Sequence, residues 1–398
     1  RRGRGVTVVL VTGARGFVGR HVADALGRRA DVDLRLAGSE TSPEVLLADA
    51  RAADAIIHLA GANRPADPAD FARVNAELTE RLCEAAAAGG RRPTLVLASS
   101  IQAGGDTPYG ASKRRAEDAV RRWAEAGHGR AVAFRLSNVF GKWCRPRYNS
   151  AVATFCHAVA NGLPYEVHDL AREVPLVYVD DVVDALLAAA GLGAANSEPH
   201  AAQSGAAEPV AFRTAEAGPV YRVTLGDVVA RLLAFRESRA TLAVPDFADP
   251  FTAKLYPTYL SYLPADAFAY DLTRRTDARG TLAEFVKQPG FGQVFVSRTH
   301  PGVTRGDHVH HTKTEKFLVL EGDAVVRFRA MGGDEVLEYP VAGTDFRVVD
   351  IPPGYTHSIE NVGAGELVVL FWSSQVFDPA RPDTYADPVL REAAVAGA

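Results

Sequence analysis

The sequence is poor in sulfur, with three cysteines and one methionine in 398 residues. Cys83, Cys144 and Cys156 have no C-x-x-C spacing and leave one thiol over in any pairing, so they predict reduced thiols rather than a disulfide framework. No apolar run is long enough to span a bilayer, and no signal-peptide core precedes the first strand. We therefore expect a cytoplasmic protein without membrane insertion.

The chain also lacks an excess of charge of one sign. It carries 44 Lys and Arg against 48 Asp and Glu, a formal net charge of −4. This balance gives no general attraction for nucleic acid, so we expect no nucleic-acid partner. The apolar fraction of 47% and the charged fraction of 23% are typical of a folded chain, and the length predicts two or three domains.

The first half of the sequence alternates strands with amphipathic helices, which predicts a parallel sheet with right-handed crossovers. The apolar periodicity predicts strands at residues 7–11, 33–37, 55–59, 94–98 and 131–135 and helices at 18–26, 71–88 and 112–126. Thr224 and Asp227 resemble a capping box that opens a further helix. We expect a surface loop at residues 196–219 and packed irregular chain at the proline-rich residues 241–264.

The second half has a different pattern, with short alternating runs separated by glycine-containing turns. These runs predict strands at residues 293–297, 316–320, 324–328, 346–350 and 367–371. Such spacing is typical of an antiparallel sandwich or barrel of the jelly-roll kind. We therefore expect a Rossmann-type α/β domain over residues 1–266, followed by an all-β domain over residues 267–398.

A glycine-rich turn follows the first strand and opens the first helix. Gly13, Gly16 and Gly19 permit a tight turn and the close approach of a pyrophosphate to the helix N-terminus. Their spacing resembles that of extended short-chain dehydrogenase/reductases. The resemblance implies a dinucleotide site that contains Gly13, Arg15, Gly16, Phe17, Val18, Gly19, Ser39, Leu59, Ala60, Gly61, Asn75, Ser99, Tyr109, Lys113 and Leu136.

The choice of cofactor depends on the end of the second strand. The acidic residue that holds the ribose of NAD is missing immediately after residue 37. Arg15 precedes the second motif glycine, where a cation meets the 2′-phosphate of NADP. Together the two features favour NADPH, while the nearby Glu40 keeps NADH open.

Tyr109 and Lys113 lie four residues apart and therefore on one face of a helix. We expect the Lys113 ammonium to lower the pKa of the Tyr109 phenol, which then protonates a substrate oxygen. In the reductase family, Ser100 matches the hydroxyl that binds the reacting carbonyl. Ile101 and Gln102 stand where related dehydratases carry an acid pair, so we expect reduction or oxidation rather than dehydration.

The chain after the fifth strand, from residue 135 to 141, resembles the family's nucleotide-sugar loop, and cations follow it that suit a diphosphate. The candidate substrate residues are Asn138, Lys142, Arg147 and Asn149.

Two patterns in the second half resemble the two motifs of cupins: G-x5-H-x-H-x4-E-x6-G at residues 302–322 and P-x-G-x2-H-x3-N at residues 352–361. Alternate residues of a strand face one side, so His308 and His310 both point inward. The glycine that often precedes the motif proline by six residues is Phe346 here.

Three imidazoles and one carboxylate suit Zn²⁺, Fe²⁺, Ni²⁺ or Mn²⁺. The metal can act as a Lewis acid or only hold the strands together, and the sequence leaves both roles open. The candidate metal ligands are His308, His310, Glu315 and His357.

A reductase-type domain followed by a cupin resembles bacterial capsular-polysaccharide enzymes of the CapF type, with further matching segments at residues 140–144, 148–150, 258–264 and 377–379. The resemblance implies a homodimer whose zinc-containing cupin domain epimerises a UDP-4-keto-6-deoxy-HexNAc at C3. Its reductase domain then reduces C4 with NADPH. Two alternatives stay open: a single-activity 4-ketoreductase whose cupin only binds sugar or mediates dimerisation, and an epimerase that retains and recycles NAD.

Overall fold

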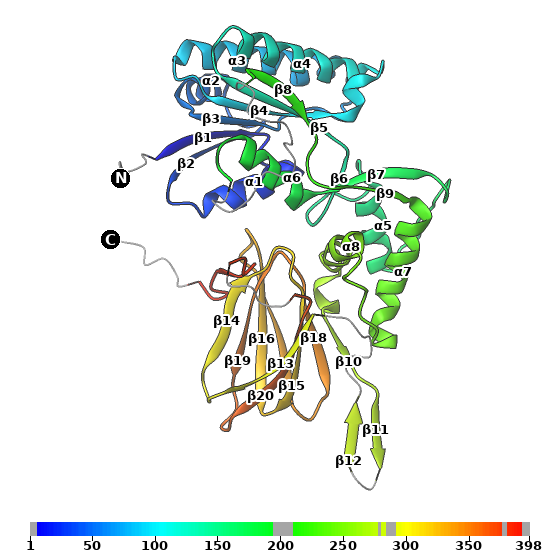
Figure 1. Ribbon diagram of the computed structural model, residues 1–398. Helices are drawn as coiled ribbons and strands as arrows, with labels where there is room; N and C mark the ends of the chain where they lie inside the picture. The colour runs from blue at the N-terminus through cyan, green and yellow to red at the C-terminus, as the bar shows by residue number, and fades with distance from the viewer. Residues whose placement is uncertain (1–5, 194–209, 278–279, 284–291, 376–379, 392–398) are drawn as a thin grey trace. The chain divides into compact units, whose positions relative to one another are not determined.

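The computed structural model describes residues 6–193, 210–277, 280–283, 292–375 and 380–391 (Figure 1). Contacts within the chain define two compact units. The first contains Arg1–Phe140, Arg147–Ser150 and Glu173–Val223, and the second contains Gly141–Pro146, Ala151–Arg172 and Thr224–Ala398. The boundary expected at residues 266 and 267 falls inside the second unit, which combines helices with strands. The matching segment 377–379 lies outside the described residues.

The first unit is built on a six-stranded, all-parallel sheet in the order β2-β1-β3-β4-β5-β8, which confirms the Rossmann-type prediction. Its strands are β1 (Thr7–Thr12), β2 (Val32–Ala37), β3 (Ala55–His58), β4 (Thr94–Ser100), β5 (Arg130–Leu136) and β8 (Phe212–Ala215). Residues 196–209 of the loop expected at 196–219 lie outside the described residues, and strand β8 corrects the expectation for the rest of it. It is a four-residue edge strand with no buried position, too short to show a strand period in the sequence.

Helices cover both faces of this sheet. On one face, α1 (Phe17–Gly27) and α6 (Val179–Ala189) share an apolar core with the strands, and on the other face so do α2 (Pro43–Ala52), α3 (Leu78–Gly89) and α4 (Pro108–Glu125). Short helices η1 (Phe71–Glu77) and η2 (Ile101–Gly104) precede α3 and α4. A small sheet of β6 (Asn138–Phe140), β7 (Glu173–Tyr178) and β9 (Val220–Thr224) completes the unit. The glycine turn after β1 and the end of β4 share the carboxyl edge of the sheet, where ligands of such folds bind.

The helices of the second unit are α5 (Ala151–Ala160), α7 (Leu225–Thr241), α8 (Pro250–Leu260) and the short η3 (Ala265–Ala267). The Thr224 hydroxyl accepts the Asp227 N–H at 3.0 Å, so α7 begins at the predicted cap. Helix α8 corrects the irregular chain expected there. Asp249 caps it and Pro250 occupies its first turn, where the missing N–H costs nothing, although Pro257 lies inside the helix.

The strands of the second unit form an antiparallel sandwich, which confirms the jelly-roll prediction. One sheet is ordered β10-β18-β15-β20-β13 and the other β17-β16-β19-β14-β21, and β11 and β12 form a separate hairpin. The bounds are β10 (Ala269–Asp271), β11 (Arg274–Asp277), β12 (Gly280–Ala283), β13 (Gln293–Thr299), β14 (Thr304–Val309), β15 (Glu315–Glu321), β16 (Asp323–Ala330), β17 (Val336–Ala342), β18 (Arg347–Ile351), β19 (Tyr355–Asn361), β20 (Leu367–Ser373) and β21 (Tyr385–Ala386).

The sequence predicts no membrane-spanning segment and reduced cysteine thiols, and the described residues bear on both predictions. Among them, no helix has both the length and the apolar character needed to cross a membrane. Cys83, Cys144 and Cys156 are all described and buried, and no disulfide joins them.

Candidate functional site

The turn between β1 and α1 is built for close backbone approach. Gly13 has a φ of 66°, and a Cβ at this position would lie 2.7 Å from the Ala60 backbone nitrogen. A Cβ on Gly19 would lie 2.1 Å from the Gly13 carbonyl oxygen. Helix α1 begins after Gly16, which provides no side-chain cap, so the first-turn N–H groups are available to an anion. This geometry fits the pyrophosphate of a dinucleotide.

Arg15, the residue expected to bind a 2′-phosphate, forms an ion pair with Glu40 at 2.9 Å. Both side chains are exposed, at 77% and 46%. Ser39 lies beside Glu40 and is also exposed. The two residues on which the cofactor prediction depended are therefore adjacent in space, one suited to a phosphate and the other to a ribose hydroxyl.

Ser100, Tyr109 and Lys113 are brought together at the end of β4 and the start of α4. Tyr109 forms a hydrogen bond with Ser100, and the Lys113 ammonium lies 6.0 Å from the centre of the Tyr109 ring. The pKa of the Tyr109 phenol is nevertheless raised, because burial outweighs the hydrogen bond from Ser100. This differs from the expected lowering by Lys113, since the ammonium donates instead to the Ala98 carbonyl oxygen at 2.9 Å.

The Lys113 side chain is buried, with 7% of the residue's surface exposed. A Cβ on Gly61 would lie 3.1 Å from its Nζ and 2.9 Å from Asn75 Oδ1, so glycine is needed there. Asn75 donates to Ser112 Oγ at 3.0 Å and accepts the Ala62 N–H at 2.8 Å, which ties the wall of the site to α4. Burial lowers the pKa of the Lys113 ammonium to about 8, against an opposing effect of the Glu117 carboxylate.

The candidate substrate residues do not form one group. Asn138 is exposed and donates to the Pro175 carbonyl oxygen at 3.0 Å. Arg147 and Asn149 are also exposed. Lys142 is 1% exposed, and its ammonium donates to the His311 carbonyl oxygen at 3.3 Å. In this structure Lys142 therefore contacts the β-domain, and its expected contact with a diphosphate stays a prediction.

The four predicted metal ligands converge inside the sandwich. Strands β14 and β19 place His308 opposite His357, and Glu315 begins β15. Strand β14 ends at Val309, so His310 lies just beyond it, yet the His308 and His310 ring centres are only 4.7 Å apart. One potential ligand atom from each of the four residues lies within 4.8 Å of the other three.

The donor set fits a bound cation. His310 Nε2 and His357 Nε2 are buried, have no hydrogen-bond partner among the described residues, and lie 3.5 Å and 3.7 Å from Glu315 Oε2. Two ligands of one tetrahedral zinc ion are roughly 3.4 Å apart, given metal–ligand bonds of about 2 Å. Burial lowers the pKa of His357, and burial with two neighbouring imidazoles lowers that of His308 to about 4. A lowered pKa leaves the His308 and His357 imidazoles neutral and able to bind a metal.

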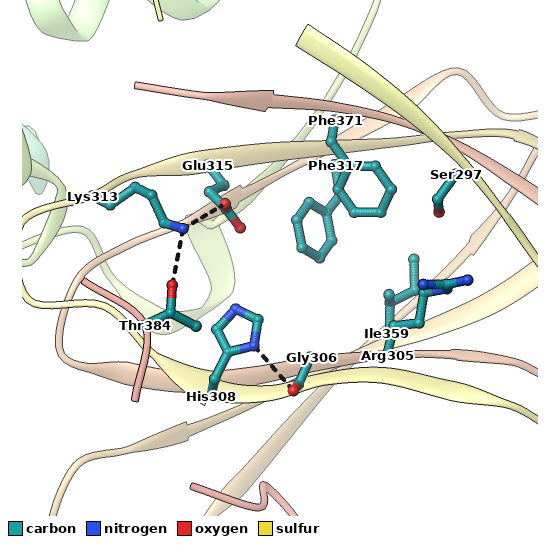
Figure 2. A pocket seen from close by; sticks show the side chains of 10 residues that line it. All are labelled: Ser297, Arg305, Gly306, His308, Lys313, Glu315, Phe317, Ile359, Phe371 and Thr384. Atoms are coloured by element: carbon teal, nitrogen blue, oxygen red, sulfur yellow. Dashed lines mark hydrogen bonds and ion pairs between the residues drawn. The ribbon is translucent and has the colours of Figure 1, made fainter. Parts of the chain in front are cut away.

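The cluster of His308, His310, Glu315 and His357 lies beside a cavity of about 340 Å³ in the same domain, which His308 and Glu315 help to line (Figure 2). His308, Glu315 and Lys313 line one end, where the Lys313 ammonium lies 3.4 Å from Glu315 Oε1. The rings of Phe317 and Phe371 form the wall between the two ends. At the other end, Figure 2 shows Arg305, Ser297 and Ile359.

Two family models match the chain: the NAD dependent epimerase/dehydratase family over residues 9–203, and the polysaccharide biosynthesis C-terminal domain over residues 275–385. A UDP-2-acetamido-2,6-beta-L-arabino-hexul-4-ose reductase from Pseudomonas aeruginosa is 42% identical over 378 residues. These cover 95% of this chain and 98% of the relative. The chain belongs to the CapF-type family of nucleotide-sugar reductases.

Solved structures of the CapF-type family agree with this assignment. The crystal structure of the capsular polysaccharide assembling protein CapF from Staphylococcus aureus is 39% identical, with a TM-score of 0.63. The match covers 96% of this chain and 99% of that one. A structure of CapF with the inhibitor 3-isopropenyl-tropolone is 36% identical, with a TM-score of 0.58. This match covers 96% of this chain and 100% of that one. The Rossmann-type unit is therefore the NAD(P)-binding part of a nucleotide-sugar ketoreductase.

Sequence reasoning missed a buried carboxylate in this CapF-type reductase site. Glu117 accepts hydrogen bonds from the Ser99 hydroxyl and from Arg135, whose closest nitrogen is 2.7 Å away. It lies one helical turn after Lys113 on α4, and this i, i+4 spacing was the available signal. Glu117 therefore links the end of β4 to β5, and its negative charge acts on the nearby Lys113 ammonium.

Proposed function

We propose that the chain is a bifunctional nucleotide-sugar enzyme. Its cupin domain epimerises a UDP-4-keto-6-deoxy-HexNAc at C3, and its reductase domain reduces the C4 ketone with NADPH, giving a UDP-2-acetamido-2,6-dideoxy-L-talose-type product. The observation that carries this proposal is a second site, the His308 cluster and its cavity, present in addition to the Tyr109 site. The name of the Pseudomonas aeruginosa relative describes a 4-ulose, the kind of ketone that such a reductase consumes.

The reduction uses the residues at the end of β4. Bound NADPH supplies the hydride that adds to C4. Ser100 and Tyr109 hold the carbonyl oxygen by hydrogen bonds, and Tyr109 passes its proton to that oxygen as negative charge develops there. The Lys113 ammonium stabilises the phenolate that is left. Arg15 selects the 2′-phosphate, because its ion pair with Glu40 is exposed and easily exchanged.

The epimerisation needs a proton removed from C3 and returned to its other face. A 4-keto group acidifies this C–H bond, because the negative charge left behind is shared with the ketone oxygen. A divalent cation held by the His308 cluster, zinc by family resemblance, stabilises that charge as a Lewis acid when bound. The Lys313 ammonium beside Glu315 adds positive charge at the same end of the cavity.

The rest of the cavity suits the remainder of the substrate. Arg305 donates its Nε to Thr299 Oγ1 at 2.8 Å and one terminal nitrogen to the Arg298 carbonyl oxygen at 3.1 Å, which fixes the guanidinium. A fixed guanidinium matches the geometry of a phosphate. We therefore assign the sugar to the metal end and the diphosphate to the Arg305 end.

The experiment that tests the proposal is NMR of a UDP-4-keto-6-deoxy-HexNAc incubated with the full chain in D₂O, with and without NADPH. We expect deuterium at C3 without NADPH, and stoichiometric NADPH oxidation with a C4 alcohol when it is added. NADPH oxidation without any C3 exchange would contradict the bifunctional proposal and support the single-activity reductase instead. Turnover without NADPH consumption would leave the epimerase that recycles NAD.

The proposal also includes a functional division near residue 266 and a homodimer. Light scattering of the full chain after size-exclusion chromatography is expected to give twice the chain mass of 42.5 kDa. A mass of one chain would remove the dimer from the proposal and leave the two activities standing.

A further inference from the structure

Residues 383–389, which we name the clasp, lie along the sheet that contains β14 and β19. Its strand β21 pairs with β14, so that Ala386 lies opposite His308. The buried Arg329 side chain anchors it by donating to Asp387 Oδ1 at 2.9 Å and to the Pro388 and Val389 carbonyl oxygens. The clasp is thus a built part of the β-domain beside one of the metal ligands.

The first clasp residue, Asp383, holds the loop between two other ligands. Its carboxylate accepts the backbone N–H groups of residues 311–313 at distances of 3.0, 2.9 and 2.7 Å. It also accepts the Thr312 hydroxyl at 2.9 Å. This loop joins His310 to Glu315 and carries Lys313 to the cavity. One carboxylate therefore fixes the conformation of the whole connection.

The backbone of Asp383 acts on a ligand directly. Its carbonyl oxygen lies 2.6 Å from His310 Nδ1, so that Nδ1 carries the proton and Nε2 keeps its lone pair toward the cluster. Asp383 has a φ of 38°, an uncommon value for a residue with a side chain. The four hydrogen bonds to the carboxylate compensate for this strain and keep the carbonyl aimed at His310.

We propose that Asp383 is a positioning residue of the metal centre, which sets the tautomer of His310 and orders the loop that delivers Lys313. The inference rests on the proposed metal function and adds a residue outside both cupin motifs. A hydrogen bond to the second nitrogen of a ligating imidazole raises its basicity and fixes the plane of its ring. Loss of such a partner weakens metal binding by about 10–100-fold.

The test uses the full chain, stripped of metal and titrated with Co²⁺, whose visible absorption reports the number and geometry of its ligands. Asp383→Asn keeps the size of the side chain but replaces one acceptor oxygen with an NH₂ group, which opposes the N–H groups that this oxygen accepted. We expect Co²⁺ affinity to fall about 10–100-fold and the spectrum to change. Circular dichroism before the titration checks that Asp383→Asn is folded. If Asp383→Asn does not fold, Asp383→Ser is titrated in its place.

The matched control is Asp387→Asn, the same substitution in the same clasp. The Asp387 carboxylate contacts Arg329 and Thr356 and none of the four ligands. We expect a lower melting temperature with unchanged Co²⁺ affinity and spectrum. Unchanged Co²⁺ binding in Asp383→Asn, or an equal loss of Co²⁺ affinity in Asp383→Asn and Asp387→Asn, would overturn the role of Asp383. The proposed metal site itself would still stand. A wild-type chain that binds no Co²⁺ or Zn²⁺ would overturn the metal site and the inference together.

Discussion

Burial raises the pKa of the Tyr109 phenol, so at neutral pH the group is a protonated acid held beside Ser100. Tyr109→Phe removes the phenolic proton, the more acidic of the two hydroxyl protons beside a developing alkoxide at C4. We expect NADPH oxidation with the 4-keto sugar to fall by about 10²–10⁴-fold. NADPH affinity, measured by fluorescence titration, is expected to stay near the wild-type value because the ring remains. Turnover close to wild type would contradict the role of Tyr109.

The lysine beside Tyr109 gives the reduction a pH dependence. Burial lowers the pKa of Lys113 to about 8, so its ammonium loses charge as pH rises through that value, whereas the raised pKa keeps Tyr109 protonated. We expect kcat/KM for reduction to be highest below about pH 8 and to fall above it. Because the Glu117 carboxylate opposes the lowering, Glu117→Gln should move this fall to lower pH. A profile that the variant leaves unshifted would exclude the coupling.

The Arg15–Glu40 pair provides a test of cofactor choice. Both side chains are exposed, so their ion pair adds little stability and either can exchange its partner for a bound cofactor. Arg15→Ala should weaken NADPH about tenfold, by loss of one charge-assisted contact, and change NADH little. Glu40→Gln should have the opposite bias, since it removes a repulsion of the 2′-phosphate and an acceptor for the ribose of NADH. Equal calorimetric affinities of NADPH and NADH for the wild-type chain would remove the preference.

Two single residues, Phe346 and Asp383, have roles that the local sequence motifs do not predict. The cupin motif indicated that a glycine is missing at Phe346, and the structure shows the reason glycine is usual there: the φ of this residue is 49°. Packing of Phe346 against Leu318 and Val348 compensates for the strain, which no motif can predict. In the same way, the ligand histidines follow from spacing, whereas Asp383 contacts His310 from 73 residues away.

At the scale of elements, the β-sandwich and helix α7 are joined through a buried ionic cluster. Asp350 on β18 is 1% exposed and accepts from Lys316 Nζ at 2.5 Å and from Arg239 at 2.7 Å. Lys316 also donates to the Tyr270 hydroxyl at 3.1 Å. Burial alone would lower the pKa of Lys316, but the Asp350 carboxylate together with Tyr256 and Tyr270 outweighs burial, and the pKa is raised. Two cations thus depend on one carboxylate.

Replacing that carboxylate should therefore destabilise the domain strongly. Asp350→Asn leaves the Lys316 and Arg239 cations buried without an anion, and we expect a loss of about 3–5 kcal/mol in the free energy of unfolding. The melting temperature of the full chain should fall accordingly. The control is Glu366→Gln, which breaks an exposed ion pair with Arg298 between neighbouring strands and should change stability by less than about 0.5 kcal/mol. Similar melting temperatures for both variants would refute the cluster's role.

The elements that the sequence predicted differ from those that it missed in how far their conformation depends on neighbouring residues of the chain. Strands β1, β3, β4 and β5 are buried on both faces and appear as continuous apolar runs in the sequence. Helix α8 was missed because its prolines act as breakers in isolation, although Pro250 occupies a position that tolerates proline. Strand β8 owes its conformation to pairing with β5, a partner about 80 residues earlier.

At the scale of the whole molecule, the proposed chemistry needs two sites that act on neighbouring carbons of one sugar. Tyr109 and Lys113 belong to the first compact unit, and the His308 cluster belongs to the second. The described residues of the Tyr109 site supply no His and carboxylate cluster for a cation, and the His308 cluster lies outside the unit that carries the dinucleotide turn. The two activities should therefore be lost separately by single substitutions.

His357→Ala removes a fully buried candidate ligand and should abolish C3 exchange in D₂O, while the variant still oxidises NADPH with a substrate already epimerised at C3. Tyr109→Phe should give the reverse pattern, with C3 exchange retained and reduction lost. The role of the metal then follows from a chelated, folded wild-type chain. Loss of exchange at an unchanged melting temperature supports a Lewis acid, whereas exchange that falls only as the β-domain melts supports a structural ion. Loss of C3 exchange in Tyr109→Phe would contradict the division of labour, since one site would then serve both carbons.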